Sequence, residues 1–262
     1  MGHLFKAFLF KLKRDLVFRI TLIVGGSLSL LIAIALGVLD IISHTELLNG
    51  LSMLLLASSP LTNYGIFIVI DVLIFICAEF AHGTIRNKII AGNSKLKIFW
   101  SLCASALVYA FVLYVLFVGV CVAIGSIFGG FSLSNQIISL ASLTGTVETD
   151  AKYVIETVVM NVLVFFSLVM FAIFLATAFR TLGPAIPIII LLILFGTTIT
   201  QILLVLFADN SMATNIIKII DPFTGLVYLD DFTFTCCVIN NTAYAVLFTT
   251  LGCLLFRKRD VK

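Results

Sequence analysis

The sequence predicts an all-α membrane protein that forms a single domain over residues 1–262, and three observations predict it. The chain is 61% hydrophobic and only 11% charged, and its mean hydropathy of +1.23 lies far outside the range of soluble domains. Six apolar segments are each long enough to cross a hydrocarbon layer of about 30 Å as a helix. Fourteen of the 16 Lys and Arg residues fall on one side of the topology that these segments define.

The six expected spans follow one another along the whole chain. They cover residues 17–39, 61–80, 98–128, 153–179, 183–207 and 236–256. The boundary between the fourth and fifth spans depends on Arg180, Thr181, Gly183 and Pro184. Residues 1–16 place Phe and Leu on one helical face and Lys and Arg around the other, which suits a helix lying at the cytosolic headgroups.

The basic residues also give an orientation. With both termini in the cytosol, only Lys152 and Lys218 lie outside, and the outer segments are acidic. This positive-inside bias predicts an even number of spans. The net charge of +3 therefore reflects topology and does not indicate a nucleic-acid partner.

A polar, basic stretch, residues 79–97, separates the second and third spans and is expected in the cytosol. Within it, Thr84 is expected to cap a short helix over Ile85 to Ala91, Gly92 to end it, and Ser94 to cap the next helix. Ile85 and Ile89 would lie one turn apart on one face of this short helix. The pattern predicts an apolar ridge that is offered to a partner protein outside the bilayer.

This stretch carries a family resemblance. Glu79, Gly83 to Lys88 and Gly92 resemble the end of the second helix and the coupling helix of ATP-binding-cassette type 2 permeases, and the ending LFRKRDVK is similar to that family's usual ending. The resemblance implies a membrane-spanning subunit of an ATP-driven exporter in a bacterial plasma membrane. Its cargo would be amphipathic or hydrophobic, and among relatives of this length an antimicrobial or toxic peptide.

The resemblance also implies partners. Two separate ATPase subunits would bind ATP and Mg²⁺, and a second permease chain would complete the complex as a homodimer or a close heterodimer. It implies an N-terminal elbow helix over residues 1–16. The chain itself lacks a phosphate-binding G-x-x-x-x-G-K-[ST] loop and is expected to hold no cofactor or metal.

Roles for individual residues follow from the resemblance. The surface coupled to the ATPase would comprise Thr84, Ile85, Arg86, Asn87, Lys88, Ile89 and Ile90, with a hinge at Glu79, Gly83 and Gly92. Glu79 would contact Arg86 or the short helix, an interpretation that the resemblance favours over an ordinary acid at the membrane edge.

Polar residues within the spans are candidates for a cargo path. Asp71 lies about 13 Å before Phe80 along a helix, near the bilayer midplane, where a carboxylate is costly. Either it faces a path or it hydrogen-bonds a neighbouring helix. Thr197, Thr198 and Gln201 in the fifth span either line a cleft or pack against another helix. Asn161 in the fourth span has the same two interpretations.

Three other classes of function remain to be weighed. An intramembrane protease would need a buried histidine, but His3, His44 and His82 lie at or outside the edges of the spans. A membrane anchor or assembly factor would not need the cytosolic ridge. A secondary transporter would need more intramembrane charge than Asp71 supplies, together with paired half-repeats.

Overall fold

The computed structural model describes residues 10, 16–43, 50–58, 63–130, 137–138, 146–147, 151–207, 212, 216–217 and 231–258. The longer elements in these residues are helices: α2 (Leu16–Ser43), α3 (Gly50–Ser58), α4 (Asn63–Ala81), α5 (Thr84–Ile90), α6 (Lys95–Gly129), α7 (Ala151–Phe179), α8 (Leu182–Leu206) and α10 (Asp231–Lys258). Strands β1 (Ile137–Ile138) and β2 (Thr146–Val147) form a two-residue antiparallel pair. The predicted helical class is confirmed apart from this pair.

Four of these helices are long and apolar enough to cross a membrane. The spans are Phe18–Val38, Lys95–Gly129, Val154–Phe179 and Phe234–Lys258. Gly65–Ala81 and Thr84–Ile90 pass the same test together, as a pair bent by 53°. The described part of the chain therefore has the character of a multi-pass membrane protein, and helices occupy all six ranges predicted from the sequence. The predicted helix over residues 1–16 lies almost entirely outside the description.

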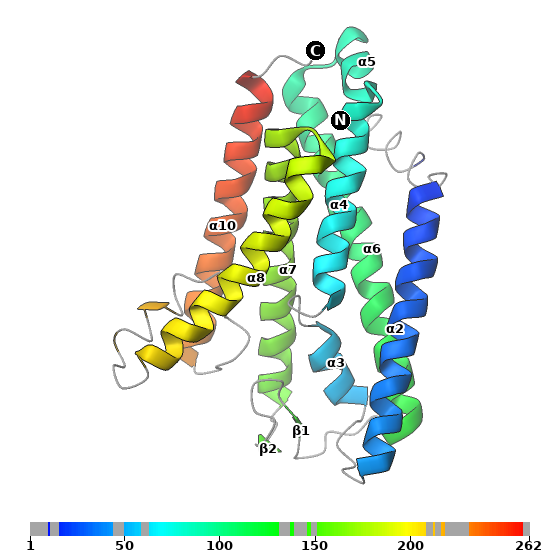
Figure 1. Ribbon diagram of the computed structural model, residues 1–262. Coiled ribbons are helices and arrows are strands. Elements are labelled where there is room, and N and C mark those ends of the chain that lie inside the picture. Colours follow the sequence, from blue (N-terminus) through cyan, green and yellow to red (C-terminus); the bar gives the residue numbers. More distant parts are fainter. Residues whose placement is uncertain are drawn as a thin grey trace.

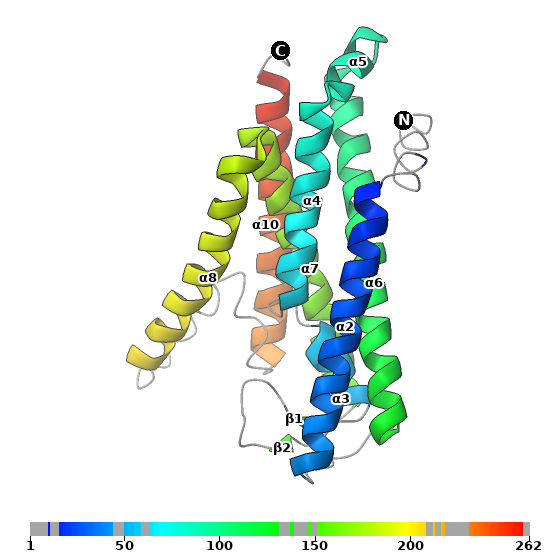
Figure 2. The same cartoon turned by 45° about the vertical axis from the view of Figure 1, so that its right-hand side comes forward.

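The helices form an elongated bundle in which α4, α6, α7 and α10 lie side by side (Figure 1). Helix α10 packs along α7, and α2 packs along α6. Figures 1 and 2 both show α8 leaning away from the bundle with distance from its α7 end. Consistent with this, the described buried residues of α8, Ala185 and Ile189, lie in its first half.

Two glycines allow α2 and α6 to approach closely. A Cβ atom at Gly25 would lie 2.9 Å from the ring of Phe117, and one at Gly37 would lie 2.7 Å from the ring of Phe128. Thr21 and Tyr109 share a hydrogen bond of 3.2 Å further along the same contact. Residues that come later in α2 contact residues that come later in α6, so the two helices run parallel.

Helix α3 is a difference from the sequence-based expectation, which assigned no element to residues 50–58. Its nine residues are too short to span a membrane alone. They are instead buried against α6 and α7, and the N–H of Gly50 donates to Gly130 O at 2.8 Å. Both ribbon views place α3 beneath the first turn of α4, so the chain crosses this part of the bundle as two successive helices (Figures 1 and 2).

The predicted boundary between the fourth and fifth spans is confirmed. Arg180 follows α7 with a left-handed φ of 58°, its N–H donates to Ala176 O, and Thr181 is the N-cap of α8. A left-handed residue just past a helix end is a common stop. The Arg180 guanidinium lies 5.6 Å from the ring centre of Phe80, so this connection packs against the end of α4.

Candidate functional site

Helix α5 lies at one end of the bundle and is the candidate functional site. It turns away from α4 by 53° and sits beyond the ends of the long helices, at the same end as the C-terminal part of α10 and the α7–α8 connection (Figure 1). Most of the described basic residues lie on segments at this end: Arg19, Arg86, Lys88, Lys95, Lys97, Arg180, Arg257 and Lys258. Lys152 lies at the opposite end, at the start of α7. The predicted charge segregation is therefore present in the described part of the fold.

The turn into α5 differs from the prediction at one residue. Gly83 is the N-cap, with a left-handed φ of 64°, and its carbonyl accepts the N–H of Asn87 at 3.1 Å. Thr84 was expected to be the cap, and this was wrong. Because Gly83 already closes the first turn, Thr84 lies inside the helix, and its hydroxyl proton is shared between Glu79 O, at 2.8 Å, and the Glu79 carboxylate.

The side chain of Glu79 joins the end of α4 to α5. Glu79 is only 1% exposed, and its carboxylate accepts hydrogen bonds from the Thr84 hydroxyl and, at 3.2 Å, from Lys88 Nζ. The expected contact between Glu79 and the short helix is therefore present, and the described bonds run to Thr84 and Lys88. Charge-assisted bonds of this kind are stronger than neutral ones, so they fix the angle between the two helices.

The end of α5 matches the prediction closely. Gly92 has a left-handed φ of 85°, its N–H donates to Ile89 O at 2.9 Å, and the N–H of Asn93 reaches Lys88 O at 3.3 Å. These two bonds define a Schellman motif, which satisfies carbonyls left over at a helix end. The predicted start of the next helix at Ser94 is confirmed, because Ser94 is the N-cap of α6 and its carbonyl accepts from Ile98.

The predicted apolar ridge on α5 is wrong. Ile85 is fully buried and Ile89 is partly buried against the hydrophobic core, so both face the protein itself. A seven-residue helix cannot be stable alone in water, and its apolar face packs on the bundle instead of remaining open. The face that remains exposed carries Arg86, Asn87 and Ile90, and Ile90 is 73% exposed. We refer to these three residues as the α5 outer face.

The residues proposed for a cargo path are not brought together by any described contact. Asp71 is 5% exposed and lies among the core residues of α4. Thr198 is exposed on the part of α8 that leans outward, and the side chains of Thr197 and Gln201 lie outside the description. The described residues also contain no group of three or more His, Cys, Asp or Glu placed to hold a metal ion.

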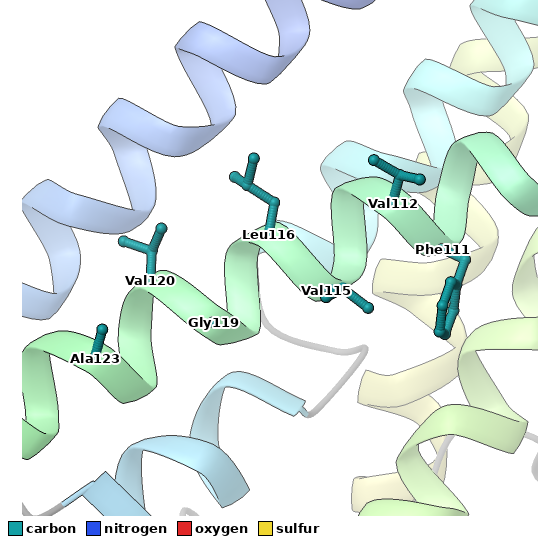
Figure 3. Close-up of a pocket in the computed structure, with 7 residues that line it drawn as sticks. All are labelled: Phe111, Val112, Val115, Leu116, Gly119, Val120 and Ala123. Carbon is teal, nitrogen blue, oxygen red and sulfur yellow. The ribbon is translucent and has the colours of Figure 1, made fainter.

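A shallow depression of about 520 Å³ lies on the outside of α6 (Figure 3). Its lining comes from one face of that helix, with Gly119 at a point where a Cβ would meet nothing within 4 Å. The lining residues are Phe111, Val112, Val115, Leu116, Gly119, Val120 and Ala123. None of them has a polar side chain, so the depression offers shape and apolar contact without hydrogen bonds.

Residues 21–262 match the model of a family described as a protein of unknown function, DUF2705. The chain belongs to this family. The match covers every described helix except the first turn of α2, so the α5 site lies within the family's shared region. No curated protein and no solved structure matches this DUF2705 chain.

Proposed function

We propose that this DUF2705 protein is the membrane-spanning permease subunit of an ATP-driven exporter of the ATP-binding-cassette type 2 class. In this proposal it crosses a bacterial plasma membrane six times, with both termini in the cytosol. It pairs with a second permease chain, in a homodimer, and with two separate ATPase subunits that bind ATP and Mg²⁺. The observation that carries the proposal is the geometry of α5, a short helix set at 53° to α4 and bonded to it at the basic end of the bundle.

Two features suit α5 to receive a push from a partner. Its outer face combines a cation, an amide and an exposed apolar side chain, which is a compact protein-binding surface. Its inner face is anchored twice, by buried Ile85 and by the bonds between Glu79 and Lys88. A displacement of α5 would therefore pass to α4 without being absorbed in a loose connection.

The mechanism follows from this attachment. Closure of the two ATPases on ATP moves α5, and the rigid junction passes that movement to α4 and α6, which are continuous with it on either side. The permease then alternates between arrangements open to the inside and to the outside. The described surfaces of α6 and α8 are largely apolar, which favours an amphipathic or hydrophobic cargo such as a peptide.

The proposal predicts that the α5 outer face is required for ATPase binding. In a strain that carries the cognate ATPase, Arg86→Glu combined with Ile90→Asp should reduce ATPase copurification at least tenfold, equivalent to about 1.4 kcal/mol. The new acidic groups would have to be desolvated against a surface shaped for an apolar group and a cation. Permease in the membrane fraction is quantified in parallel.

A matched control lies at the other end of α6. Ile127 is 81% exposed, and Ile127→Asp should leave copurification unchanged. Full recovery of the ATPase with the Arg86 and Ile90 double variant, at normal permease levels, would contradict the proposed role of α5.

A second candidate is an ion-driven secondary transporter, and the division of one crossing into α3 and α4 favours it. Such transporters commonly build their sites at discontinuous helices. The two candidates differ in their energy source. Cargo export from sealed vesicles that requires ATP and survives collapse of ion gradients supports the permease, whereas the reverse dependence supports the secondary transporter.

A further inference from the structure

Helix α3 has its last described residue, Ser58, buried within the protein, and α4 begins at Asn63. The C-terminal end of a helix carries a partial negative charge. Side chains of α6 and α7 contact Ser58, and their chemistry indicates what this end can bind.

Three buried side chains form a connected group, which we call the Ser58 cluster: Ser58, Tyr114 and Asn161. The Tyr114 hydroxyl donates to Ser58 O at 2.9 Å, and the Ser58 hydroxyl donates to Leu55 O at 3.0 Å. The Asn161 Nδ2 donates to Ser58 Oγ at 2.7 Å. The cluster thus links α3, α6 and α7 around the end of α3.

One oxygen of the cluster has no partner. Asn161 is 1% exposed, and its Oδ1 forms no hydrogen bond with the protein. The orientation of its amide follows from the hydrogen bonds around it. The Ser58 hydroxyl donates its proton to Leu55 O, so its oxygen acts as an acceptor and faces the Nδ2 group of Asn161. Leaving a buried acceptor unsatisfied is costly, so a ligand for this oxygen is expected.

A second buried asparagine, Asn241, provides a comparison with Asn161, since it is also almost completely buried. Its Nδ2 donates to Cys237 O at 3.0 Å. Its Oδ1 lies 3.0 Å from the Ser167 hydroxyl, whose proton is shared with Val164 O at 2.8 Å. Each end of the Asn241 amide therefore has a polar partner within the protein.

The free bonding capacity of the Ser58 cluster is therefore that of acceptor oxygens. Its described hydroxyl protons are already donated to carbonyls. The C-terminal end of α3 adds its own negative electrostatic potential to that of the acceptor oxygen. No carboxylate takes part in the bonds described for the cluster, whereas divalent cations in proteins usually require one. Carbonyl-type oxygens at the C-terminal end of a discontinuous helix suit a singly charged cation.

We propose that the Ser58 cluster binds a monovalent cation, with Asn161 Oδ1 as a ligand at the C-terminal end of α3. Bound there, the cation would neutralise the helix end and hold α3 between α6 and α7. The site is independent of α5, and it would serve either an ATP-driven or an ion-driven transporter. Sodium, potassium and ammonium share the required chemistry, and the experiment separates them.

The test measures thermal unfolding of the full-length protein in detergent at constant ionic strength. The salts are sodium, potassium and ammonium chloride, with N-methyl-D-glucamine chloride as the reference for a cation too large for a buried site. We expect one of the small cations to raise the unfolding midpoint saturably by about 3 °C or more. Equal midpoints in all four salts would mean that water satisfies the Asn161 oxygen and would overturn the proposal.

Variants then place the effect at the cluster. Asn161→Leu should abolish the cation-dependent shift, whereas the control Asn241→Leu should lower the midpoint in every salt and retain the shift. A shift that persists in Asn161→Leu would overturn the proposal, because the cation would then bind elsewhere. If Asn161→Leu is not recovered in folded form, Asn161→Asp gives an independent result. Its added negative charge should lower the cation concentration for half-maximal stabilisation at least tenfold, and an unchanged concentration would count against the site.

Discussion

At the scale of single residues, Glu79 determines the geometry of the candidate site. Its carboxylate is buried, yet it is bonded to a hydroxyl and an ammonium group from the next helix. The sequence could indicate that Glu79 matters through the family resemblance, because an acid at the membrane edge is otherwise ordinary. It could not indicate Lys88 as the partner, because that choice depends on the direction in which the chain turns at Gly83.

A double-mutant cycle can measure the coupling between Glu79 and Lys88. Changing each to Ala singly and together should give a coupling free energy of about 2 kcal/mol, since each single change removes the opposite charge from the group that remains, while Glu79 keeps its bond from Thr84. The control is the pair Lys152 and Glu156, which is 3.7 Å apart and more exposed, at 64% for Lys152 and 21% for Glu156. That cycle should give at most about 0.5 kcal/mol. Equal coupling energies in the two cycles would show that burial does not strengthen the Glu79 pair.

Residues that the sequence alone assigned incorrectly share a physical cause. Thr84 has the chemistry of a cap, and Ile85 and Ile89 have the spacing of a ridge, but neither pattern records which side of a short helix is covered. The bundle end covers the Ile85 side. The exposed isoleucine of α5 is therefore Ile90, which the periodic pattern did not distinguish from its neighbours.

At the scale of elements, the end of α5 and the start of α6 were the most predictable features. Gly92 and Ser94 act through local backbone geometry, which depends on sequence neighbours alone. Helix α3 was not predictable in the same way. Its apolar run, residues 53–56, is too short to signal a span, and only contacts with distant parts of α6 and α7 bury it.

The contact between α2 and α6 supports a prediction about two adjacent glycines. Gly25→Ala should destabilise the protein by about 1–3 kcal/mol, because the new methyl group would lie 2.9 Å from the ring of Phe117, which is buried in the core. Gly26→Ala is the control, since its methyl group would lie 3.6 Å from Leu116, an ordinary contact. It should be neutral or stabilise the protein by up to about 1 kcal/mol, through higher helix propensity. The measurement is the thermal unfolding midpoint of each variant in detergent. A Gly25→Ala variant as stable as Gly26→Ala would contradict the prediction and show that α2 and α6 can move apart at little cost.

At the scale of the whole molecule, hydropathy and charge predicted the helical class and the segregation of basic residues. The helical class and the segregation of charge both depend on the order of apolar and basic residues along the chain, because the bilayer constrains every membrane-spanning chain in the same way. The outward lean of α8 and the burial of Asp71 could not be predicted, because they depend on how helices pack around one another. Four of the helices qualify as spans by length and composition.

Cysteine labelling can test the orientation. Lys97 lies near the start of α6 and Lys152 near the start of α7, at opposite ends of the bundle, and both side chains are exposed. In a background without the six native cysteines, Lys152→Cys should react with an impermeant maleimide on intact cells. Lys97→Cys should react only after the membrane is permeabilised. Labelling of both from outside would exclude the proposed topology.

The early end of α4 has a mechanical consequence. A helix that crossed the full bundle would act as a rod and deliver movement at one surface directly to the other. Helix α4 instead begins above α3, so in the proposed mechanism a push on α5 would arrive in the middle of the bundle (Figures 1 and 2). Movement would then reach the far side through α6 and α7, which contact both α3 and α4.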